Sequence, residues 1–264
     1  MSKNLNFYRS ISMKNIIQAI DWISMHSMGI VLVGEQGVEK DWIAKLIHDL
    51  SSRRNNKFIF LDCQNVHPDN LIRILFGEEK ISNNSIEKHP GLLETASGGT
   101  IFLDNFSIIP SEFQDRISLA FKTKMVRRIG GYEDILINVR PITGIYTKDG
   151  VYLYQANDFQ RIYSKFCPIS INIPPLRERK EDILFLLNKF FKESNLAAVK
   201  KIKGFSKKIY KVLNNYHWPG NTKQLFEVVN YAIMMCDTDL ISIEHLPGYI
   251  QTFNESTQFK NVLT

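Results

Sequence analysis

The sequence predicts an α/β domain built on a parallel sheet, followed by a smaller domain of helices. Strand and helix signals alternate over the first two-thirds of the chain, which is typical of a parallel sheet with helices on its faces. The strand segments are largely apolar, as in sheets that are buried on both faces. From about residue 180 onward the signals are helical. We therefore expect a sheet domain first and a helical domain after it.

Five apolar segments are expected to form the sheet: residues 29–33 (GIVLV), 58–63 (FIFLDC), 99–106 (GTIFLDNF), 137–146 (INVRPITGIY) and 168–173 (PISINI). Helical patterns lie between them, such as KDWIAKLIHDL from Lys40 and SEFQDRISLAF from Ser111. Pro174 and Pro175 end the last strand. The predicted organisation is a tail over 1–11, the sheet domain over 12–176, the helical domain over 177–252 and a second tail over 253–264.

The composition is that of a soluble globular protein. Of 264 residues, 44% are hydrophobic and 23% are charged. No apolar run is long enough to cross a membrane, and the N-terminus lacks the apolar core of a signal peptide. Cys63, Cys167 and Cys236 fit no disulfide or zinc spacing, so we expect a reducing, cytoplasmic location. The net charge of +6 fits either nucleic-acid contact or a lysine-rich solvated surface.

The stretch IVLVGEQGVEKDWIAKLIH reads as an apolar strand, a loop with a lysine, and an amphipathic helix. In a phosphate-binding loop, backbone N–H groups point inward at a helix N-terminus, glycines allow close approach, and a lysine contacts the outer phosphates. Gly34, Gly37 and Lys40 have this spacing, and Asp41 stands where Ser or Thr is common. Glu39 stands where such loops usually carry glycine. The alternative is a strand-to-helix turn with an exposed lysine.

A carboxylate, Asp104, ends the third predicted strand. In nucleotide-dependent ATPases a carboxylate at this place organises Mg²⁺, and a following acidic residue orients the attacking water. The following residue here is Asn105. An amide can hydrogen-bond to water, but it cannot accept a proton from water as a carboxylate can.

Further blocks of the sequence are LIHDLSSRRNNKFIFLDC, LFGEEK, PGLLETASGGTIFLDN, IPPLRERKEDI and WPGNTKQL. In this order they resemble the AAA+ domain of bacterial enhancer-binding proteins, the sigma-54-dependent transcription activators. The resemblance covers residues 12–250. It implies an AAA+ P-loop NTPase fold with a five-stranded parallel sheet and a helical lid. It also implies assembly into a ring, with ATP or ADP and Mg²⁺ bound between subunits.

By this resemblance, the residues that would bind nucleotide are Gly34, Gly37, Lys40, Asp41, Asp104 and Lys223, with Asp104 as the magnesium ligand. The chain also departs from the family. Glu39 replaces the third loop glycine and adds a negative charge beside the phosphates, Asn105 replaces the acidic residue, and Asp62 stands where an asparagine usually holds that acid in check.

The remaining departures concern γ-phosphate sensing and the neighbouring subunit. Ile145 and Tyr146 stand where the family has a Thr-Asn pair that senses the γ-phosphate. Phe159 and Lys165 stand at the arginine fingers, with Arg161 nearby. Lys223 replaces the lid arginine, and a lysine lacks the planar fork of arginine.

One loop of the family also differs here. Between LFGEEK and PGLLETA the family carries a Gly-Ala-Phe-Thr-Gly-Ala loop that contacts the sigma factor. The same length of this chain holds Ile81, Ser82, Asn83, Asn84, Ser85 and Ile86. The aromatic tip and the glycines are absent. The segment is therefore either a generic polar surface loop or a loop adapted to another partner.

Taken together, these residues predict a degenerate AAA+ protein that has lost hydrolysis but keeps weak nucleotide binding. Such a protein would regulate transcription as a homo-oligomer or together with an active AAA+ relative. Two alternatives remain open. The chain is a slow but genuine ATPase, or it is a nucleic-acid-binding module that uses the basic stretch VKKIKGFSKK of residues 199–208.

Overall fold

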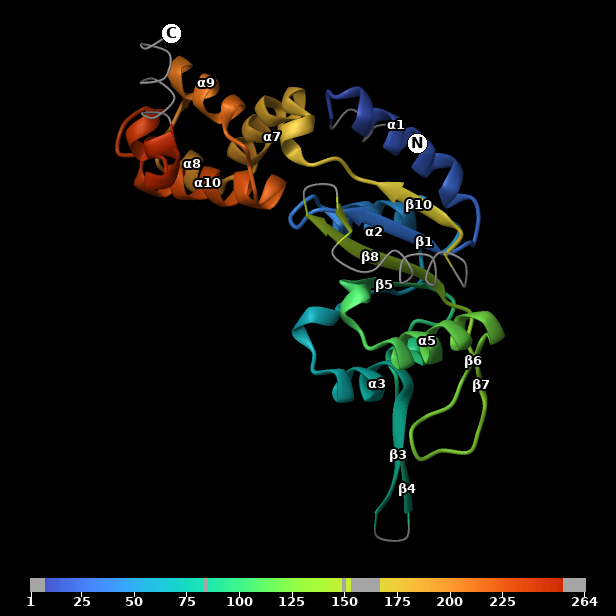
Figure 1. The fold of residues 1–264 in the computed structure, drawn as a ribbon. Helices are drawn as coiled ribbons and strands as arrows, with labels where there is room; N and C mark the ends of the chain where they lie inside the picture. The colour runs from blue at the N-terminus through green and yellow to red at the C-terminus, as the bar shows by residue number, and fades with distance from the viewer. Residues whose placement is uncertain (1–7, 83–84, 149–150, 153–166, 254–264) are drawn as a thin grey trace. The chain divides into compact units, whose positions relative to one another are not determined.

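The computed structural model describes residues 8–82, 85–148, 151–152 and 167–253 (Figure 1). The chain divides into two compact units. The sheet unit takes its described residues from Gln18–Glu35 and Glu39–Ile173. The helical unit takes its described residues from the segment before Gln18, from Gln36–Val38, and from Pro174 onward. The loop that follows the first strand therefore contributes residues to both units.

The sheet unit is built on five parallel strands in the order β10-β1-β8-β5-β2 (Figure 1). Their bounds are Ile30–Gly34 for β1, Phe58–Asp62 for β2, Thr100–Asp104 for β5, Arg140–Lys148 for β8 and Ile169–Asn172 for β10. The predicted parallel sheet and its strands are thereby confirmed. A short additional strand, β9 (Val151–Tyr152), pairs antiparallel with the end of β8. β1 lies between β8 and β10 and is buried along its whole length.

Helices and short 3-10 turns connect the strands of this unit. They are α1 (Ile11–Ser24), which begins in the helical unit, α2 (Lys40–Asp49), η1 (Cys63–Asn65), α3 (Pro68–Phe76), α4 (Leu92–Thr95), η2 (Phe106–Ile108) and α5 (Ser111–Thr123). Their apolar side chains pack against those of the strands, and Leu75, Leu103 and Ile117 are fully buried in this core. The burial of such side chains is the main source of stability in a domain of this kind.

The segment that was expected to form a surface loop belongs mostly to a β-hairpin. β3 (Gly77–Ser82) and β4 (Ser85–Pro90) pair antiparallel in a register that runs from Gly77 opposite Pro90 to Ser82 opposite Ser85. The backbone pairing includes four residues of the predicted loop, which are therefore strand residues: Ile81, Ser82, Ser85 and Ile86. Asn83 and Asn84 lie outside the described residues. In Figure 1 the hairpin projects from the body of the sheet unit.

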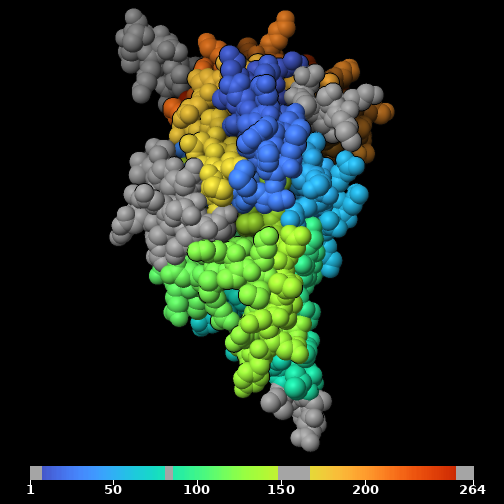
Figure 2. Space-filling model, turned by 90° about the vertical axis from the view of Figure 1, so that its right-hand side faces the viewer, coloured from blue at the N-terminus to red at the C-terminus, as the bar shows by residue number. Residues whose placement is uncertain are grey.

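A second strand pair, β6 (Met125–Val126) and β7 (Ile135–Leu136), runs alongside the base of this hairpin (Figure 2). The backbone N–H of Glu79 donates to the carbonyl of Ile129 at 2.8 Å. The guanidinium of Arg128 forms a two-bond contact with Glu94, at 2.6 and 3.0 Å, and also contacts Glu79 at 3.0 Å. This ion network is largely buried, and it fixes the hairpin to the body of the unit.

The helical unit follows Pro174 and is composed mainly of helices, as predicted. Its elements are η3 (Leu176–Glu178), α7 (Lys180–Glu193), α8 (Asn195–Val199), β11 (Gly204–Phe205), α9 (Lys207–Asn215), α10 (Asn221–Met235), β12 (Leu240–Ile241) and η4 (Ile243–His245). The indole of Trp218 is fully buried, and its Nε1 donates to the carbonyl of Leu213 at 2.8 Å. This contact anchors the turn between α9 and α10, which carries the WPGN block.

The segment before α1 is bound to the helical unit through one buried carboxylate. Asp182, in the first turn of α7, accepts hydrogen bonds from the backbone N–H groups of Arg9 and Ser10 and from the Ser10 hydroxyl. Asp182 itself is fully buried. Because a buried carboxylate needs such donors, this contact specifies where the N-terminal segment lies.

Two further properties follow from the described part of the chain. None of its helices is long and apolar enough to span a membrane. Cys63, Cys167 and Cys236 are buried as free thiols, and burial raises the pKa of Cys63 and Cys167 above the usual range. Their burial makes thiolate chemistry unfavourable at neutral pH.

We predict that stability falls as the pH drops below about 6.5, because of His48. Its ring on α2 is buried, with Nδ1 3.0 Å from the hydroxyl of Thr100, and burial lowers its pKa from 6.5. Between the lowered pKa of His48 in the folded chain and its ordinary pKa of 6.5 in the unfolded chain, the unfolded chain binds more protons. The contribution of His48 to stability is therefore fully present above pH 6.5 and is lost as the pH falls through this range.

The measurement is the melting temperature between pH 5 and pH 8. His48→Gln, which can still bond to Thr100 but cannot titrate, should flatten this dependence, whereas His26→Gln at an exposed position should not. Equal slopes for the wild-type chain and His48→Gln would contradict the prediction.

Candidate nucleotide-binding site

The lysine of the predicted phosphate-binding loop is buried where α2 begins. Lys40 is the first residue of α2, and its Nζ donates to the carbonyls of Gly34 at 3.3 Å and Glu35 at 3.1 Å. Burial lowers the pKa of Lys40, and the nearby carboxylates of Asp104, Asp41 and Asp62 oppose this shift. The alternative of an exposed lysine is therefore wrong, since only 6% of Lys40 is exposed. A buried ammonium group at a helix N-terminus is suited to phosphate oxygens.

Glu39 keeps the backbone conformation that a glycine would adopt at its position. Its φ of 67° and ψ of 41° are left-handed, and it precedes α2 without a side-chain capping hydrogen bond. A residue with a Cβ in this conformation costs about 1 to 2 kcal/mol relative to the right-handed region. The loop thus has the backbone conformation of a glycine at position 39, but the residue there is a glutamate. The glutamate brings both backbone strain and a carboxylate to the loop.

The ends of β2 and β5 bring two carboxylates to the same edge of the sheet. Asp62 and Asp104 are the last residues of these strands and lie opposite each other in register. Burial raises the pKa of Asp104, and the Lys40 ammonium group is the main charge that opposes this rise. The negative charge of Asp62 acts in the same direction as burial. Lys40, Asp62 and Asp104 therefore share one electrostatic site.

Asn105 and Asp62 form a direct hydrogen bond. Nδ2 of Asn105 donates to Oδ1 of Asp62 at 2.8 Å, and the backbone N–H of Asn105 donates to Oδ1 of Asp104 at 3.0 Å. Asn105 has a left-handed backbone, with φ of 54°, which asparagine tolerates better than most residues. The sequence analysis gave the two residues as separate departures from the family. The contact between their side chains is an observation of the structure.

Gly144 is a residue of the site that the sequence analysis did not single out. It lies inside β8, and a Cβ at this position would be 1.9 Å from Oδ1 of Asp104. The absence of a side chain therefore makes room for the Asp104 carboxylate. A glycine inside a predicted strand is a known signal of such close approach, so the sequence could have indicated it.

The other predicted positions on β8 are poorly suited to sensing a phosphate. Ile145 is buried in the apolar core, and Tyr146 is partly buried opposite Gly34 in the register of β1 and β8. Phe159, Arg161 and Lys165, the positions assigned to the arginine fingers, lie outside the described residues.

The middle of the loop belongs to the helical unit, where it contacts the start of α10. The carbonyl of Gly37 accepts from the backbone N–H of Lys223 at 3.2 Å, and the carbonyl of Gln36 accepts from Nδ2 of Asn221 at 2.9 Å. Gly37 has φ of 78°, and a Cβ on it would be 2.2 Å from the carbonyl oxygen of Gly220. Glycine is therefore required at position 37 both by conformation and by space.

Lys223 lies beside the middle of the loop, within the helical unit. It lines a cavity of about 310 Å³ together with Gln36, Gly37, Gly220, Gln224 and Glu227. The carboxylate of Glu227 on the same wall adds a negative charge to this cavity. Lys223 supplies a single cationic group here, without the bidentate geometry of an arginine.

The donor set of the sheet unit is compatible with a nucleotide and magnesium. Within the described residues, no three His, Cys, Asp or Glu side chains gather closely enough to hold a metal ion by themselves. Mg²⁺ at nucleotide sites is usually bound by one or two carboxylates together with phosphate oxygens and water, so the single carboxylate of Asp104 suits that role. Lys40 and the N-terminus of α2 suit the phosphates, and Glu39 opposes them by its charge.

The sheet topology, the loop before α2 and the helical unit define a P-loop protein of the AAA+ class. The sequence model of the sigma-54 interaction domain matches residues 7–172, and that of the AAA+ ATPase lid domain matches residues 177–262. The chain therefore belongs to the sigma-54 interaction domain family, as its sequence blocks had indicated.

Known relatives with similar sequences are transcriptional activators. The chain is 32% identical over 241 residues to the transcriptional activator RocR of Bacillus subtilis, covering 90% of this chain and 52% of RocR. It is 29% identical to the DNA-binding transcriptional activator HyfR of Escherichia coli, covering 96% of this chain and 38% of HyfR. The chain thus spans about half or less of the length of these curated relatives.

The fold is also similar to a solved structure of NtrX from Brucella abortus in complex with ADP. The TM-score is 0.79 at 26% sequence identity, over 92% of this chain and 54% of the NtrX chain. NtrX has also been solved in complex with ATP, with the same TM-score and identity.

We predict that Glu39→Gly stabilises the protein and strengthens nucleotide binding. The glycine would remove the left-handed strain, which is worth about 1 to 2 kcal/mol. It would also remove a carboxylate beside the phosphates, where like charges about 4 Å apart repel by roughly 1 kcal/mol in water and more in a partly buried site. Thermal unfolding and titration of a fluorescent ATP analogue measure the two effects.

Glu39→Gln separates strain from charge, because it removes the charge and keeps the Cβ. It should improve binding of the ATP analogue and leave the melting temperature nearly unchanged. If Glu39→Gly changes neither quantity, neither the strain nor the carboxylate at this position matters.

Proposed function

We propose that this chain is a cytoplasmic, hydrolysis-deficient AAA+ protein that regulates transcription through its AAA+ oligomer interfaces. It would bind ATP or ADP with Mg²⁺ weakly and assemble with copies of itself or with an active AAA+ relative. The observation that carries the proposal is the hydrogen bond between Asn105 and Asp62. It means that an amide occupies the position directly after Asp104, and that the carboxylate of the pair is on the neighbouring strand.

The hydrogen bonds of Asp62 support the loss of hydrolysis. A carboxylate has about four lone-pair sites. Three donors contact the carboxylate of Asp62: Nδ2 of Asn105 at 2.8 Å, the backbone N–H of Gln64 at 3.0 Å and Nδ2 of Asn65 at 2.8 Å. A general base must have a free lone pair within reach of the water proton that it accepts. Three of these four sites on Asp62 are thus occupied, one of them by the N–H that caps η1, so the carboxylate acts mainly as a structural acceptor.

The positions that would sense the γ-phosphate support the same conclusion. Ile145 is apolar and buried, so it cannot hydrogen-bond to a phosphate oxygen. Asn105 cannot accept a proton from water, so one group expected for water activation and one expected for phosphate sensing are both replaced. Lys40 and Asp104 remain in place, which favours binding over turnover.

The hairpin β3–β4 supports a partner other than the one implied by the family resemblance. The six residues Ile81 to Ile86 contain no aromatic side chain. Ile86 is exposed to 61%, so the hairpin presents an aliphatic group and not an aromatic tip. We infer that the hairpin contacts a different protein surface or has lost this role.

A slow ATPase is the second candidate, and the same pair of residues favours it. Because Asp62 lies 2.8 Å from Asn105, a carboxylate is still present close to the position of the missing acid. In this case Asp62 would orient the water from the neighbouring strand. The two candidates differ in whether turnover depends on Asp62.

The nucleic-acid alternative is less well supported, because part of the basic stretch is engaged within the protein. Nζ of Lys200 donates to the carbonyls of Ile233 at 3.1 Å and Cys236 at 2.9 Å, and it also contacts that of Met234. Lys203 forms an ion pair with Asp239. These lysines stabilise the end of α10 and the start of β12.

We predict that phosphate release by the purified chain with ATP and Mg²⁺ does not exceed that of Lys40→Ala. Asp62→Asn should show the same background rate, since Asp62 takes no part in turnover. The assay should be run at several protein concentrations, so that an oligomer has the chance to form. The slow ATPase would be established instead by two results together: the wild-type chain turns over ATP well above the Lys40→Ala rate, and Asp62→Asn abolishes this turnover.

We predict separately that Asn105 and Asp62 form an energetically coupled pair. Asn105→Asp alone places two carboxylates in contact and should destabilise the fold by about 1 to 3 kcal/mol. The exchange Asp62→Asn with Asn105→Asp restores an amide–carboxylate hydrogen bond, so the double variant should be closer to the wild type than the sum of the single changes. Denaturant unfolding of all four proteins measures the coupling, and strictly additive changes would show that the pair is not coupled.

A further inference from the structure

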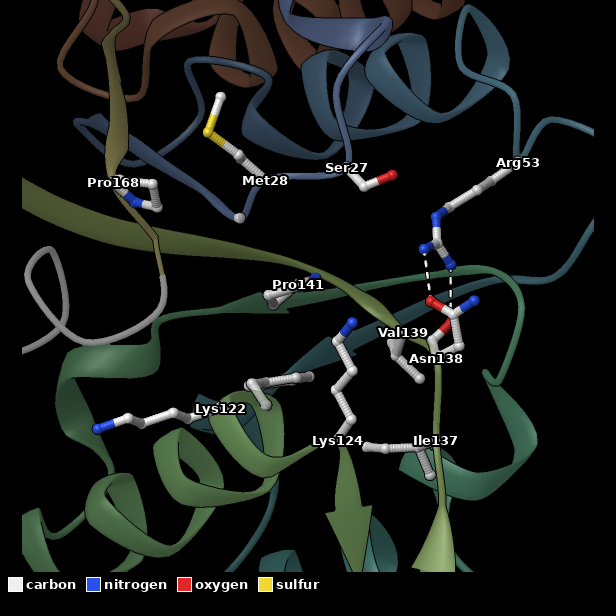
Figure 3. Close-up of a pocket in the computed structure, with 12 residues that line it drawn as sticks. Ser27, Met28, Arg53, Lys122, Lys124, Ile137, Asn138, Val139, Pro141 and Pro168 are labelled. Atoms are coloured by element: carbon white, nitrogen blue, oxygen red, sulfur yellow. Dashed lines mark hydrogen bonds between the residues drawn. The ribbon is translucent and has the colours of Figure 1, made fainter.

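A second pocket lies at the opposite edge of the sheet from Lys40 and Asp104. It has a volume of about 460 Å³ (Figure 3). Gly29, which precedes β1, and Pro168, which precedes β10, line it together with Pro141 at the start of β8. The pocket is therefore at the amino ends of these parallel strands, and it lies wholly within the sheet unit. Its volume is that of a site for one small molecule.

The charged side chains that line this pocket are all cations. They are Arg53, Lys122 and Lys124, and among the residues that the structure describes no Asp or Glu lines the pocket. A fourth cation, Arg140, is buried close by, with bonds to the carbonyls of Met28 at 3.1 Å and Ile23 at 2.8 Å. Its Nη1 has no hydrogen-bond partner within the described part of the chain. Burial, and to a smaller extent the charge of Arg53, lowers the pKa of Arg140 to about 10.

Arg53 forms a fixed wall of the pocket. Its Nη1 donates to the carbonyls of Asn138 at 2.7 Å and Gly99 at 3.1 Å, and its Nη2 donates to Oδ1 of Asn138 at 2.7 Å. Figure 3 shows this fork, with the guanidinium facing Asn138. The bonds orient the guanidinium without neutralising it, because every acceptor is an uncharged oxygen.

Lys124 directs a flexible cation into the pocket from the end of α5. It follows the last residue of that helix and has a left-handed backbone, with φ of 56°, where glycine is the usual residue. In Figure 3 its side chain extends into the pocket toward Pro141, whereas Lys122 points to one side. A lysine near a helix C-terminus would complement the helix dipole, but that role does not require a strained residue.

We propose that this pocket binds a small, phosphate-bearing anion, independently of the loop at Lys40. Several cations without an opposing carboxylate favour a ligand with more than one negative charge. A phosphate group matches both the fixed guanidinium and the mobile ammonium groups. The lining of proline and aliphatic side chains fits a compact ligand and not a nucleic-acid strand.

The test is calorimetric titration of pyrophosphate at constant ionic strength. Lys40→Ala weakens phosphate binding at the loop and should leave one binding event. In that background, Lys124→Gly should weaken pyrophosphate binding by about tenfold, because it removes a cation a few ångströms from the anion. Glycine suits the left-handed backbone at this position, so the fold should be preserved or stabilised. Lys57→Ala, at an exposed lysine outside the pocket, is the matched control and should leave binding unchanged.

Three results would overturn the proposal. The first is loss of all pyrophosphate binding in Lys40→Ala, which would assign the anion to the loop alone. The second is a pyrophosphate affinity that is the same in the double variant, Lys40→Ala with Lys124→Gly, as in Lys40→Ala alone. The third is an equal weakening by Lys57→Ala and Lys124→Gly, which would show only a response to net charge.

Discussion

The side chain of Asn221 connects three segments on which the helical unit and the loop depend. Its Oδ1 accepts from the backbone N–H of Leu176 at 2.8 Å, and its Nδ2 donates to the carbonyl of Gln36 at 2.9 Å. Asn221 is fully buried and left-handed, with φ of 52°. A buried amide in a strained backbone persists only where each of its polar atoms is satisfied. The PPLRER segment, the WPGN turn and the middle of the loop thus meet at one residue. Together with the backbone hydrogen bond between Lys223 and Gly37, this contact places Lys223 beside Gly37.

The carboxyl edge of the sheet explains how Asp62 and Asn105 are accommodated in this fold. Parallel pairing brings the ends of β2 and β5 together, so the residues at and after these ends must satisfy one another. An amide on one strand and a carboxylate on the other achieve this whichever residue carries the charge. The pair of Asp62 and Asn105 forms such a hydrogen bond. The carboxylate of the pair is on β2, and its charge acts on both Lys40 and Asp104.

The sequence predicted the sheet well, because its strands are short apolar runs whose burial is decided by composition. It did not predict β3 and β4, whose residues from Gly77 to Pro90 are mostly polar and gain their order from backbone pairing and from the contacts of Arg128. The positions of the site residues followed from motif spacing. Their contacts did not, since the direction of the Asn105 amide depends on a left-handed backbone that no local pattern specifies. The division of the loop between the two units was equally inaccessible, because it depends on Asn221, which is far away in sequence.

The net charge of +6 does not by itself indicate a partner, but its distribution over the sheet unit does. At the carboxyl edge, the carboxylates of Asp41, Asp62 and Asp104 act on Lys40, so the acidic groups around this lysine outnumber it before any ligand arrives. At the amino edge, the lining cations have no carboxylate among them. An anion therefore gains more Coulomb energy at the amino edge, unless a divalent cation first offsets the carboxylates at the loop. We therefore expect phosphate binding at the loop to depend on Mg²⁺, and phosphate binding at the proposed site on the amino edge not to depend on it. The two sites can thus be distinguished by titrating the same anion with and without the metal.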